Sequence, residues 1–139
     1  DLDGVALLAG AVAPTVDHPN GALELDHVVI RTPSLERTSA AIEQRLGLPL
    51  KRIREAGTVR QGFHRFPERG CIVELVETEG VDRASLWGLV VIVADIDAFV
   101  AGGGPGLVGE ARPAVQPGRR IATVRREAGL PCPVAVMTP

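Results

Sequence analysis

The feature that most constrains the fold of this chain is an internal repeat with a period of 61 residues. When the 139-residue sequence is shifted by 61 positions, it matches itself without a gap. The matched pairs are Leu25 and Leu86, Val29 and Val90, Ala40 and Ala101, Leu46 and Leu107, Gly57 and Gly118, Arg65 and Arg126, Cys71 and Cys132, and Val73 and Val134. A repeat of this length indicates that one supersecondary unit occurs twice.

Each unit is predicted to contain a strand, a helix and three further strands. In the first half, the β-branched run 25–31 predicts a strand. Ser34 carries the signal for the start of a helix, and Gly47 the signal for its end. Three strands are then expected at about 50–55, 59–66 and 71–77, with a hairpin turn at 67–70.

The second half follows the same order. It predicts a strand at 86–93 and a helix that begins at Asp95 and is cut short by the glycines and proline of 102–105. We interpret the glycine-rich run 102–106 as a flexible loop. Strands are expected at about 108–115, 119–126 and 133–137. The fold class is therefore α+β: two tandem βαβββ modules that form a curved mixed sheet, with the helices outside.

Composition and charge narrow the kind of protein. Hydrophobic residues make up 45% of the chain and the net charge is -2, so we expect a real core and no nucleic-acid partner. No segment approaches a bilayer-spanning length, so we expect no membrane partner and a cytoplasmic protein. Residues 1–22 are predicted to be an N-terminal extension whose apolar run 5–13 packs on the domain or supports a homodimer.

The residues 25–30 (LDHVVI), 73–77 (VELVE) and 93–97 (VADID), in this order and spacing, give the chain a family resemblance. It resembles the glyoxalase, bleomycin-resistance and extradiol-dioxygenase superfamily, also called the vicinal oxygen chelate superfamily. The resemblance covers about residues 23–138. It implies a glyoxalase-like domain at 23–139, with module one at about 23–78 and module two at about 84–139, and a small-molecule cup between them.

The resemblance also implies a divalent metal in the cup, with ligands on the first and last strand of each module. In module one these positions are His27 and Glu74, which would suit Zn, Fe, Mn, Ni or Co. In module two the equivalent positions are Gly88 and Ala135, which offer no side-chain ligand. We therefore expect a degenerate metal site and no certain cofactor.

Other residues have both a functional and a structural interpretation. A buried Glu74 without partners would have a raised pKa and would suit a catalytic base, whereas an ion pair with Arg65 or Arg31 would make it structural. His64 faces Val73 if the hairpin turn has two residues, and a slip of one residue would put it on the side of Glu74.

The remaining ligand-binding candidates are Arg31, Arg65 and Trp87. Arg31 shares a strand face with His27 and would bind a carboxylate or phosphate, or lie at a solvated strand end. Arg65 is as well explained by a structural ion pair. Trp87, the one tryptophan, would line the cup or fill the core.

Three functions are compatible with this sequence. The first is a glyoxalase-like protein that binds a small molecule without a metal; with 3% aromatic residues and no Tyr, it would take a small or polar ligand rather than a large planar one. The second is a divalent-metal-dependent lyase, isomerase or dioxygenase with a rearranged site at His27, Glu74 and His64. The third is a domain without catalysis that dimerises or serves a larger assembly. We rank them in this order.

Overall fold

The computed structural model describes residues 1–8, 10, 16–68 and 70–139. The described residues form two compact units. The first contains His27–Trp87 and the described residues near the amino terminus, and the second contains Gly88–Pro139 and residues 16–26. Both units combine strands with one α-helix, so the predicted α+β class is confirmed. No helix among the described residues is long and apolar enough to cross a membrane.

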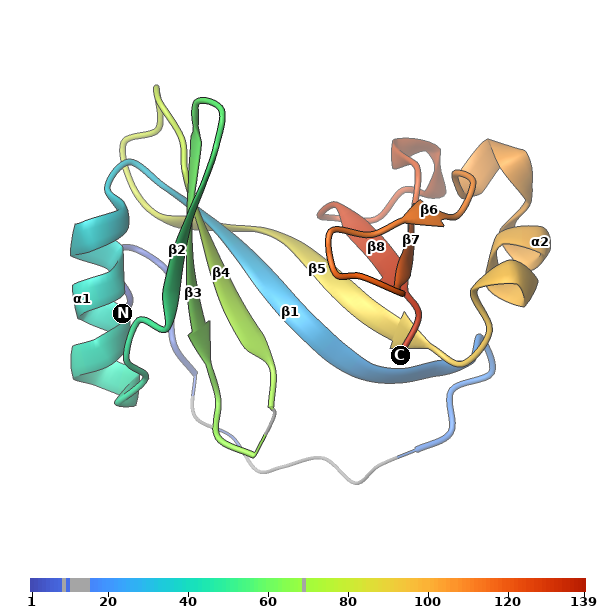
Figure 1. Cartoon of the computed structure of the whole chain (residues 1–139), viewed down its shortest axis with the longest axis horizontal. Coiled ribbons are helices and arrows are strands. Elements are labelled where there is room, and N and C mark those ends of the chain that lie inside the picture. Colours follow the sequence, from blue (N-terminus) through green and yellow to red (C-terminus); the bar gives the residue numbers. More distant parts are fainter. Residues whose placement is uncertain (9, 11–15, 69) are drawn as a thin grey trace. The chain divides into compact units, whose positions relative to one another are not determined.

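The first unit has the predicted order of elements (Figure 1). These are β1 (Ala22–Thr32), α1 (Leu35–Leu46), β2 (Arg52–Ala56), β3 (Val59–Arg65) and β4 (Ile72–Glu77). The first five residues of β1 belong to the second unit. The strands lie in the order β2-β3-β4-β1, with β1 parallel to β4 and the other pairs antiparallel. Helix α1 begins after Ser34 and ends at Gly47, as the capping signals predict.

Helix α1 packs on one face of these strands because apolar residues alternate along them. Val73 and Leu75 of β4 point toward α1 and bury against Leu35 and Ile42, which are 0% exposed. The intervening residues of β4 point to the opposite face, since successive side chains of a strand alternate. In the first unit, α1 therefore covers one face of the sheet, and the alternate side chains of β4, among them Glu74, lie on the opposite face.

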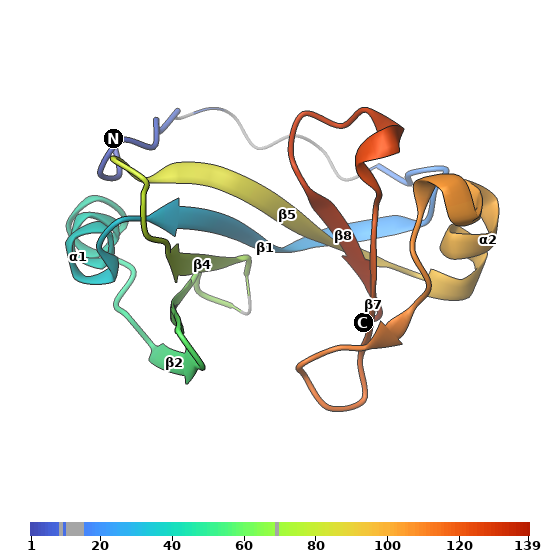
Figure 2. The ribbon, with the colours of Figure 1, turned by 90° about the horizontal axis from the view of Figure 1, so that it is seen from above.

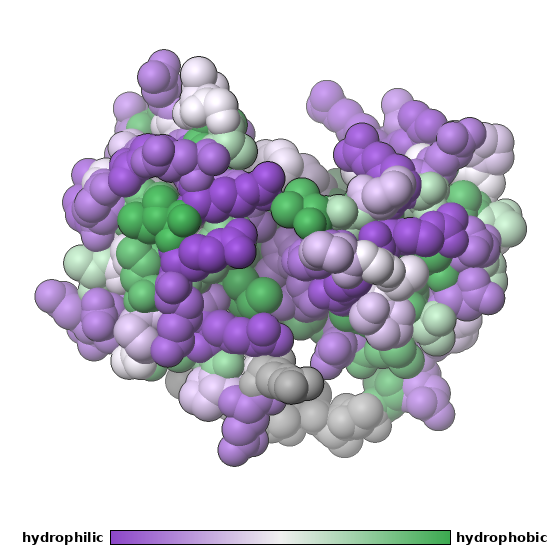
Figure 3. All heavy atoms as spheres, viewed as in Figure 1, coloured by the Kyte–Doolittle hydropathy of each residue, from purple (hydrophilic) through white to green (hydrophobic). Residues whose placement is uncertain are grey.

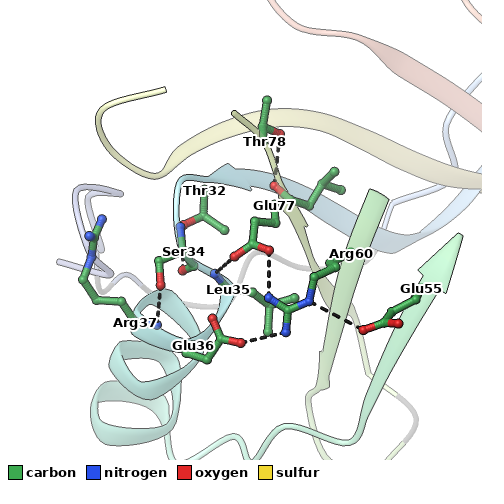
Figure 4. A network of polar contacts seen from close by, with 10 residues as sticks. Thr32, Ser34, Leu35, Glu36, Arg37, Glu55, Arg60, Glu77 and Thr78 are labelled. Carbon is green, nitrogen blue, oxygen red and sulfur yellow. Dashed lines mark hydrogen bonds and ion pairs between the residues drawn. The ribbon is translucent and has the colours of Figure 1, made fainter. Parts of the chain in front are cut away.

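A polar network fixes the start of α1 to the sheet (Figure 4). The Ser34 side chain accepts a hydrogen bond from a backbone N–H of the first helical turn. Glu77 at the end of β4 accepts another from the backbone N–H of Leu35, at 3.0 Å, and forms an ion pair with Arg60 of β3, at 2.8 Å. Two of the donors that a helix leaves unpaired at its start are thereby satisfied.

The second unit repeats this order with shorter strands (Figure 2). Its elements are β5 (Ser85–Val93), α2 (Ile96–Leu107), β6 (Arg112–Pro113), β7 (Arg120–Thr123), the 3₁₀-helix η1 (Arg126–Ala128) and β8 (Val134–Met137). The start of β5, up to Trp87, belongs to the first unit. The strands lie in the order β5-β8-β7-β6. Helix α2 starts 61 residues after α1, with Asp95 as its N-cap. Val90 pairs with Ala135 just as Val29 pairs with Glu74, so the repeat keeps its strand register.

Two sequence interpretations of the second half are wrong. The glycine-rich run is not a loop, because α2 continues to Leu107 and is kinked at Gly104, where φ is 69°. Glycine tolerates this left-handed value and so lets the helix resume with Pro105 in its new first turn. Arg126 lies in η1 and not in a strand, so it does not occupy the place that Arg65 has at the end of β3.

The described part of the amino terminus packs on the first unit. Leu2 is 4% exposed in the core of that unit, and the Asp3 carboxylate accepts hydrogen bonds from Arg37 and Thr38 of α1, at 2.8 and 2.7 Å. Of the apolar run expected at 5–13, Ala9 and residues 11–13 lie outside the described residues, as does Arg69 of the predicted hairpin turn.

Candidate functional site

The candidate site lies on the face of the first sheet that is opposite α1, which we call the site face. The strand registers assign to it His27, Val29, Arg31, Arg52, Arg54, Gln61, Phe63, Arg65, Ile72, Glu74 and Val76. The parallel pairing of β1 with β4 sets Val29 beside Glu74, and the antiparallel pairing of β3 with β4 sets Phe63 on its other side. The fold therefore brings the two predicted ligand positions of module one together.

His27, Gln61 and Glu74 form a compact polar cluster on this face. Nε2 of His27 lies 3.4 Å from Oε2 of Glu74, and Nε2 of Gln61 donates a hydrogen bond to Oε1 of Glu74 at 2.5 Å. The side chains of His27 and Glu74 are only 14% and 13% exposed. Each oxygen of the carboxylate therefore has a protein partner, and the carboxylate is largely removed from water.

Burial raises the pKa of the Glu74 carboxyl group above its ordinary value of 4.5. His27, the hydrogen bond from Gln61 and the charge of Arg54 each lower the pKa, but desolvation is the largest cause. A carboxylate whose pKa is raised accepts protons more readily than an exposed one, which is the property that a general base needs at neutral pH.

Arg31 and Trp87 lie near each other in the same unit. The guanidinium carbon of Arg31 is 5.9 Å from the centroid of the Trp87 ring, within the range of a cation–π contact. Nε of Arg31 is buried and has no hydrogen-bond partner among the described residues. Trp87 is 41% exposed, so it does not fill the core.

The structure does not bring His64 to this cluster. His64 faces Val73, as the two-residue hairpin turn predicted, and it is 0% exposed on the α1 side of the sheet. Its Nδ1 lies 2.8 Å from the carbonyl oxygen of Leu48. The rearranged site that combines His64 with Glu74 is therefore not formed. Arg65 lies on the site face but is exposed, and its Nε donates to the carbonyl oxygen of Gly70.

The second unit does not supply the donors that a four-ligand metal site would need. The positions equivalent to His27 and Glu74 are Gly88 and Ala135, and a Cβ at Gly88 would lie 2.9 Å from the carbonyl oxygen of Pro133. The backbone at this position therefore leaves no room for a side chain. Within the described ranges, no group of three or more His, Cys, Asp or Glu residues is placed to hold a metal ion. The residues present do not fit a tightly bound divalent ion.

Sequence reasoning missed Gln61 and Arg54. The signal that would have found Gln61 is the hairpin register itself: if His64 faces Val73, then Phe63 faces Glu74, and Gln61 lies two residues away on the same face. The same reasoning removes Phe63 from the core, where a phenylalanine would ordinarily be expected, because it places this side chain on the site face.

Comparisons with known proteins agree on the architecture. No family model and no curated protein matches the chain. Solved structures do match. Methylmalonyl-CoA epimerase from Mycobacterium tuberculosis has a TM-score of 0.69 and 17% identity, covering 88% of this chain and 91% of that one. A variant of the Streptomyces coelicolor enzyme, in complex with 2-nitronate-propionyl-CoA, has a TM-score of 0.64 and 18% identity, covering 84% and 97%.

The chain has the glyoxalase-like fold. A hypothetical protein from Bacillus halodurans C-125 also shares it, with a TM-score of 0.64 and 16% identity over 84% of this chain and 94% of that one. The resemblance to the glyoxalase superfamily is thus confirmed for the fold. Function has to be argued from the residues of this glyoxalase-like chain, since one fold serves many functions.

We predict that Glu74→Gln stabilises the protein. Because the pKa of Glu74 is higher in the folded than in the unfolded state, ionised Glu74 disfavours folding at pH values above 4.5. The gain in free energy of unfolding should therefore be small near pH 4, rise as the pH increases, and level off above the raised pKa. Chemical denaturation of both proteins between pH 4 and 8 measures it.

Glu36→Gln is the matched control, because Arg60 lowers the pKa of Glu36 and its carboxylate stabilises the fold. That stabilisation is present above pH 4.5 and is lost as the pH falls through the lowered pKa, so the control should destabilise at neutral pH. A loss of stability in Glu74→Gln at pH 8 would show that the carboxylate is held by favourable contacts and not by desolvation.

Proposed function

We propose that the protein binds a small anionic organic molecule on the site face of its first unit. The observation that carries this proposal is the buried polar cluster of His27, Gln61 and Glu74. Burial of such groups costs free energy, and the raised pKa of Glu74 means that its partners do not offset the whole cost. In the second unit the same sheet positions hold Gly88, Val90, Ile92, Ala135 and Met137. The second unit therefore folds without polar residues at these positions. Folding alone does not require His27 and Glu74 in the first unit, which supports a role in binding.

The charges of the site face support an anionic ligand. Arg31, Arg52, Arg54 and Arg65 share this face, and Glu74 is the single carboxylate among the residues assigned to it. Hydrophilic side chains also dominate the visible surface around β2 and β3, with apolar patches between them (Figure 3). Arginine binds carboxylates through two parallel hydrogen bonds, and Arg31 has a buried Nε for which no acceptor is described.

The aromatic side chains at the site face also limit the size of the ligand. Two aromatic rings of the first unit lie close to arginines of the site face: Arg52 lies over Phe63, and Arg31 lies over Trp87. Few aromatic surfaces are left for a large planar molecule. Structural neighbours were solved with methylmalonyl-CoA and with 2-nitronate-propionyl-CoA, whose acyl groups are small and polar. A short carboxylate with a neighbouring carbonyl group is the ligand class that we propose.

Malonate is a suitable first probe. We predict that malonate binds saturably and changes the fluorescence of Trp87, the only tryptophan, since the ring lies beside Arg31. Arg31→Leu should weaken binding at least tenfold, because a charged hydrogen bond is worth about 1.5–3 kcal/mol. Titration at low ionic strength measures the affinity.

Arg52→Leu is the matched control, because it removes the same charge from the same face at an exposed position above Phe63. It should change affinity by less than threefold. Equal losses in both variants would show that only the general positive charge of the face attracts malonate. Binding that is indifferent to Arg31→Leu would overturn the proposed site.

The raised pKa of Glu74 favours a second candidate function, proton transfer at a carbon next to a carbonyl group. In this reaction the Glu74 carboxylate would remove the proton, and the site would return a proton or a solvent deuteron to the same carbon. The metal-dependent lyase, isomerase or dioxygenase expected as the alternative from the sequence would need further ligands beside His27 and Glu74, so we propose the reaction without a metal step.

Deuterium exchange tests this candidate. If Glu74 acts as a base, the protein should accelerate exchange of the C2 proton of methylmalonyl-CoA in D₂O, followed by NMR, and Glu74→Gln should reduce the rate at least 100-fold. His27→Gln, which keeps a hydrogen-bonding side chain beside Glu74, should retain more of the rate. No acceleration by the wild-type protein would eliminate the proton-transfer candidate and leave the binding function to the malonate titration.

We also propose a homodimer and a cytoplasmic location, as the sequence led us to expect. The support for the dimer is the exposure of large apolar side chains, among them Leu8 at 96% and Leu23 at 58%. Sedimentation velocity at micromolar concentration should give twice the mass of the chain, and Leu8→Asp should shift the equilibrium toward the monomer. A monomer at all concentrations would contradict the proposal.

A further inference from the structure

A second hollow, which we call the α2 pocket, lies within the second unit between α2 and the strands β5 and β8. It has a volume of about 690 Å³. Its floor consists of Val91, Val93, Val134 and Val136, and Phe99 of α2 forms part of its wall. These valines point to the α2 side of the sheet, whereas Val90 and Ala135 point to the other side. The α2 pocket thus shares no residue with the site face.

The internal repeat explains why this space is empty. In the first unit the equivalent space under α1 is filled by Ile42 and Leu48, which are 0% and 4% exposed. The residues 61 positions later are Gly103 and Gly109. Two large core side chains are therefore missing beneath α2. A Cβ at Gly103 would collide with the side chain of Val108, so Val108 takes up part of the space that Ile42 fills in the first unit, and the α2 pocket is what remains beside it.

The loss of these side chains uncovers the floor of the α2 pocket. Val91 and Val134 are half-buried, whereas their equivalents Ile30 and Val73 are 3% and 4% exposed. At the rim, Leu107 and Leu130 are 43% and 48% exposed. Apolar surface that stays in contact with water forgoes about 25 cal/mol per Å² of stabilisation. An apolar hollow of this size in one module, with a filled counterpart in the other, is therefore a feature to be explained by an occupant.

We propose that the α2 pocket binds an uncharged aliphatic molecule. Its volume is in the range of about 300–1,000 Å³ that small-molecule sites occupy. Asp95 is the one ionisable side chain among the described residues that line it, so an anionic head group would meet repulsion and no cation. Oδ1 of Asp95 already accepts hydrogen bonds from the backbone N–H groups of Asp97 and Ala98. Phe99 is the one aromatic residue of the lining, which favours an aliphatic ligand over a stacked planar one.

1-Decanol is the probe for the test, and methyl NMR is the readout. Saturable binding should shift the methyl resonances of Val91 and Val134 and leave those of Val28 and Val73, in the first unit, in place. Decanoate should bind at least tenfold more weakly at pH 7, because its carboxylate would face Asp95. Equal affinities for alcohol and acid would overturn the uncharged class, and no saturable shift would overturn the site.

A substitution that fills the space gives a structural control. Gly102 lines the α2 pocket, and a Cβ built on it meets no atom within 4 Å, so Gly102→Leu has room to enter and should weaken decanol binding at least tenfold. Gly106→Leu adds the same side chain to the same helix, also into open space, but outside the lining, and should leave the affinity unchanged. Equal effects of the two variants would contradict the assignment.

Val134→Phe fills the same space from the sheet side, and it keeps the test decisive if a leucine in α2 prevents folding. It should weaken decanol binding while the far-ultraviolet circular dichroism stays that of the wild type. If decanol fails to bind and Gly102→Leu instead changes the sedimentation coefficient, the hollow belongs to a contact between copies of the chain, and the small-molecule proposal is wrong.

Discussion

The parallel pairing of the first and last strands of each module is the constraint on which the rest depends. In the first unit it sets Val29 of β1 beside Glu74 of β4, and with them the side chains two residues away. A shift of one residue would turn His27 or Glu74 into the core beneath α1 and expose Val73 and Leu75. The apolar contacts of α1 with β4 therefore hold the polar cluster in place, although they lie on the opposite face of the sheet.

The two modules show how one fold has diverged on its two faces. On the face opposite the helix, the first module carries His27 and Glu74 where the second carries Gly88 and Ala135. On the helix side, the first module is filled by Ile42 where the second has Gly103. The first module thus buries polar groups opposite its helix, and the second lacks a large side chain beneath its helix. Both features cost stability that a ligand would offset.

The sequence predicted much of the first module because its signals are local. Ser34 and Gly47 cap α1 through hydrogen bonds within one turn, and the hairpin turn sets the register of β3 against β4. The second module was predicted less well. Three successive glycines and Pro105 suggested a break, yet packing of Phe99 and Val100 against the core keeps α2 helical as far as the kink at Gly104, and a further turn follows the kink. Tertiary contacts there override weak helix propensity.

The sequence by itself determined the duplication and the order of elements, because strand alternation and a 61-residue repeat are written into the order of residues. The family resemblance of the sequence implied that His27 and Glu74 lie together. Only the tertiary structure decided the environment of these groups. It placed Gln61 on the Glu74 carboxylate, buried His64 beneath α1 and left a hollow under α2. Burial, desolvation and unfilled volume depend on every neighbour in space, and no periodic pattern along one strand or helix encodes them.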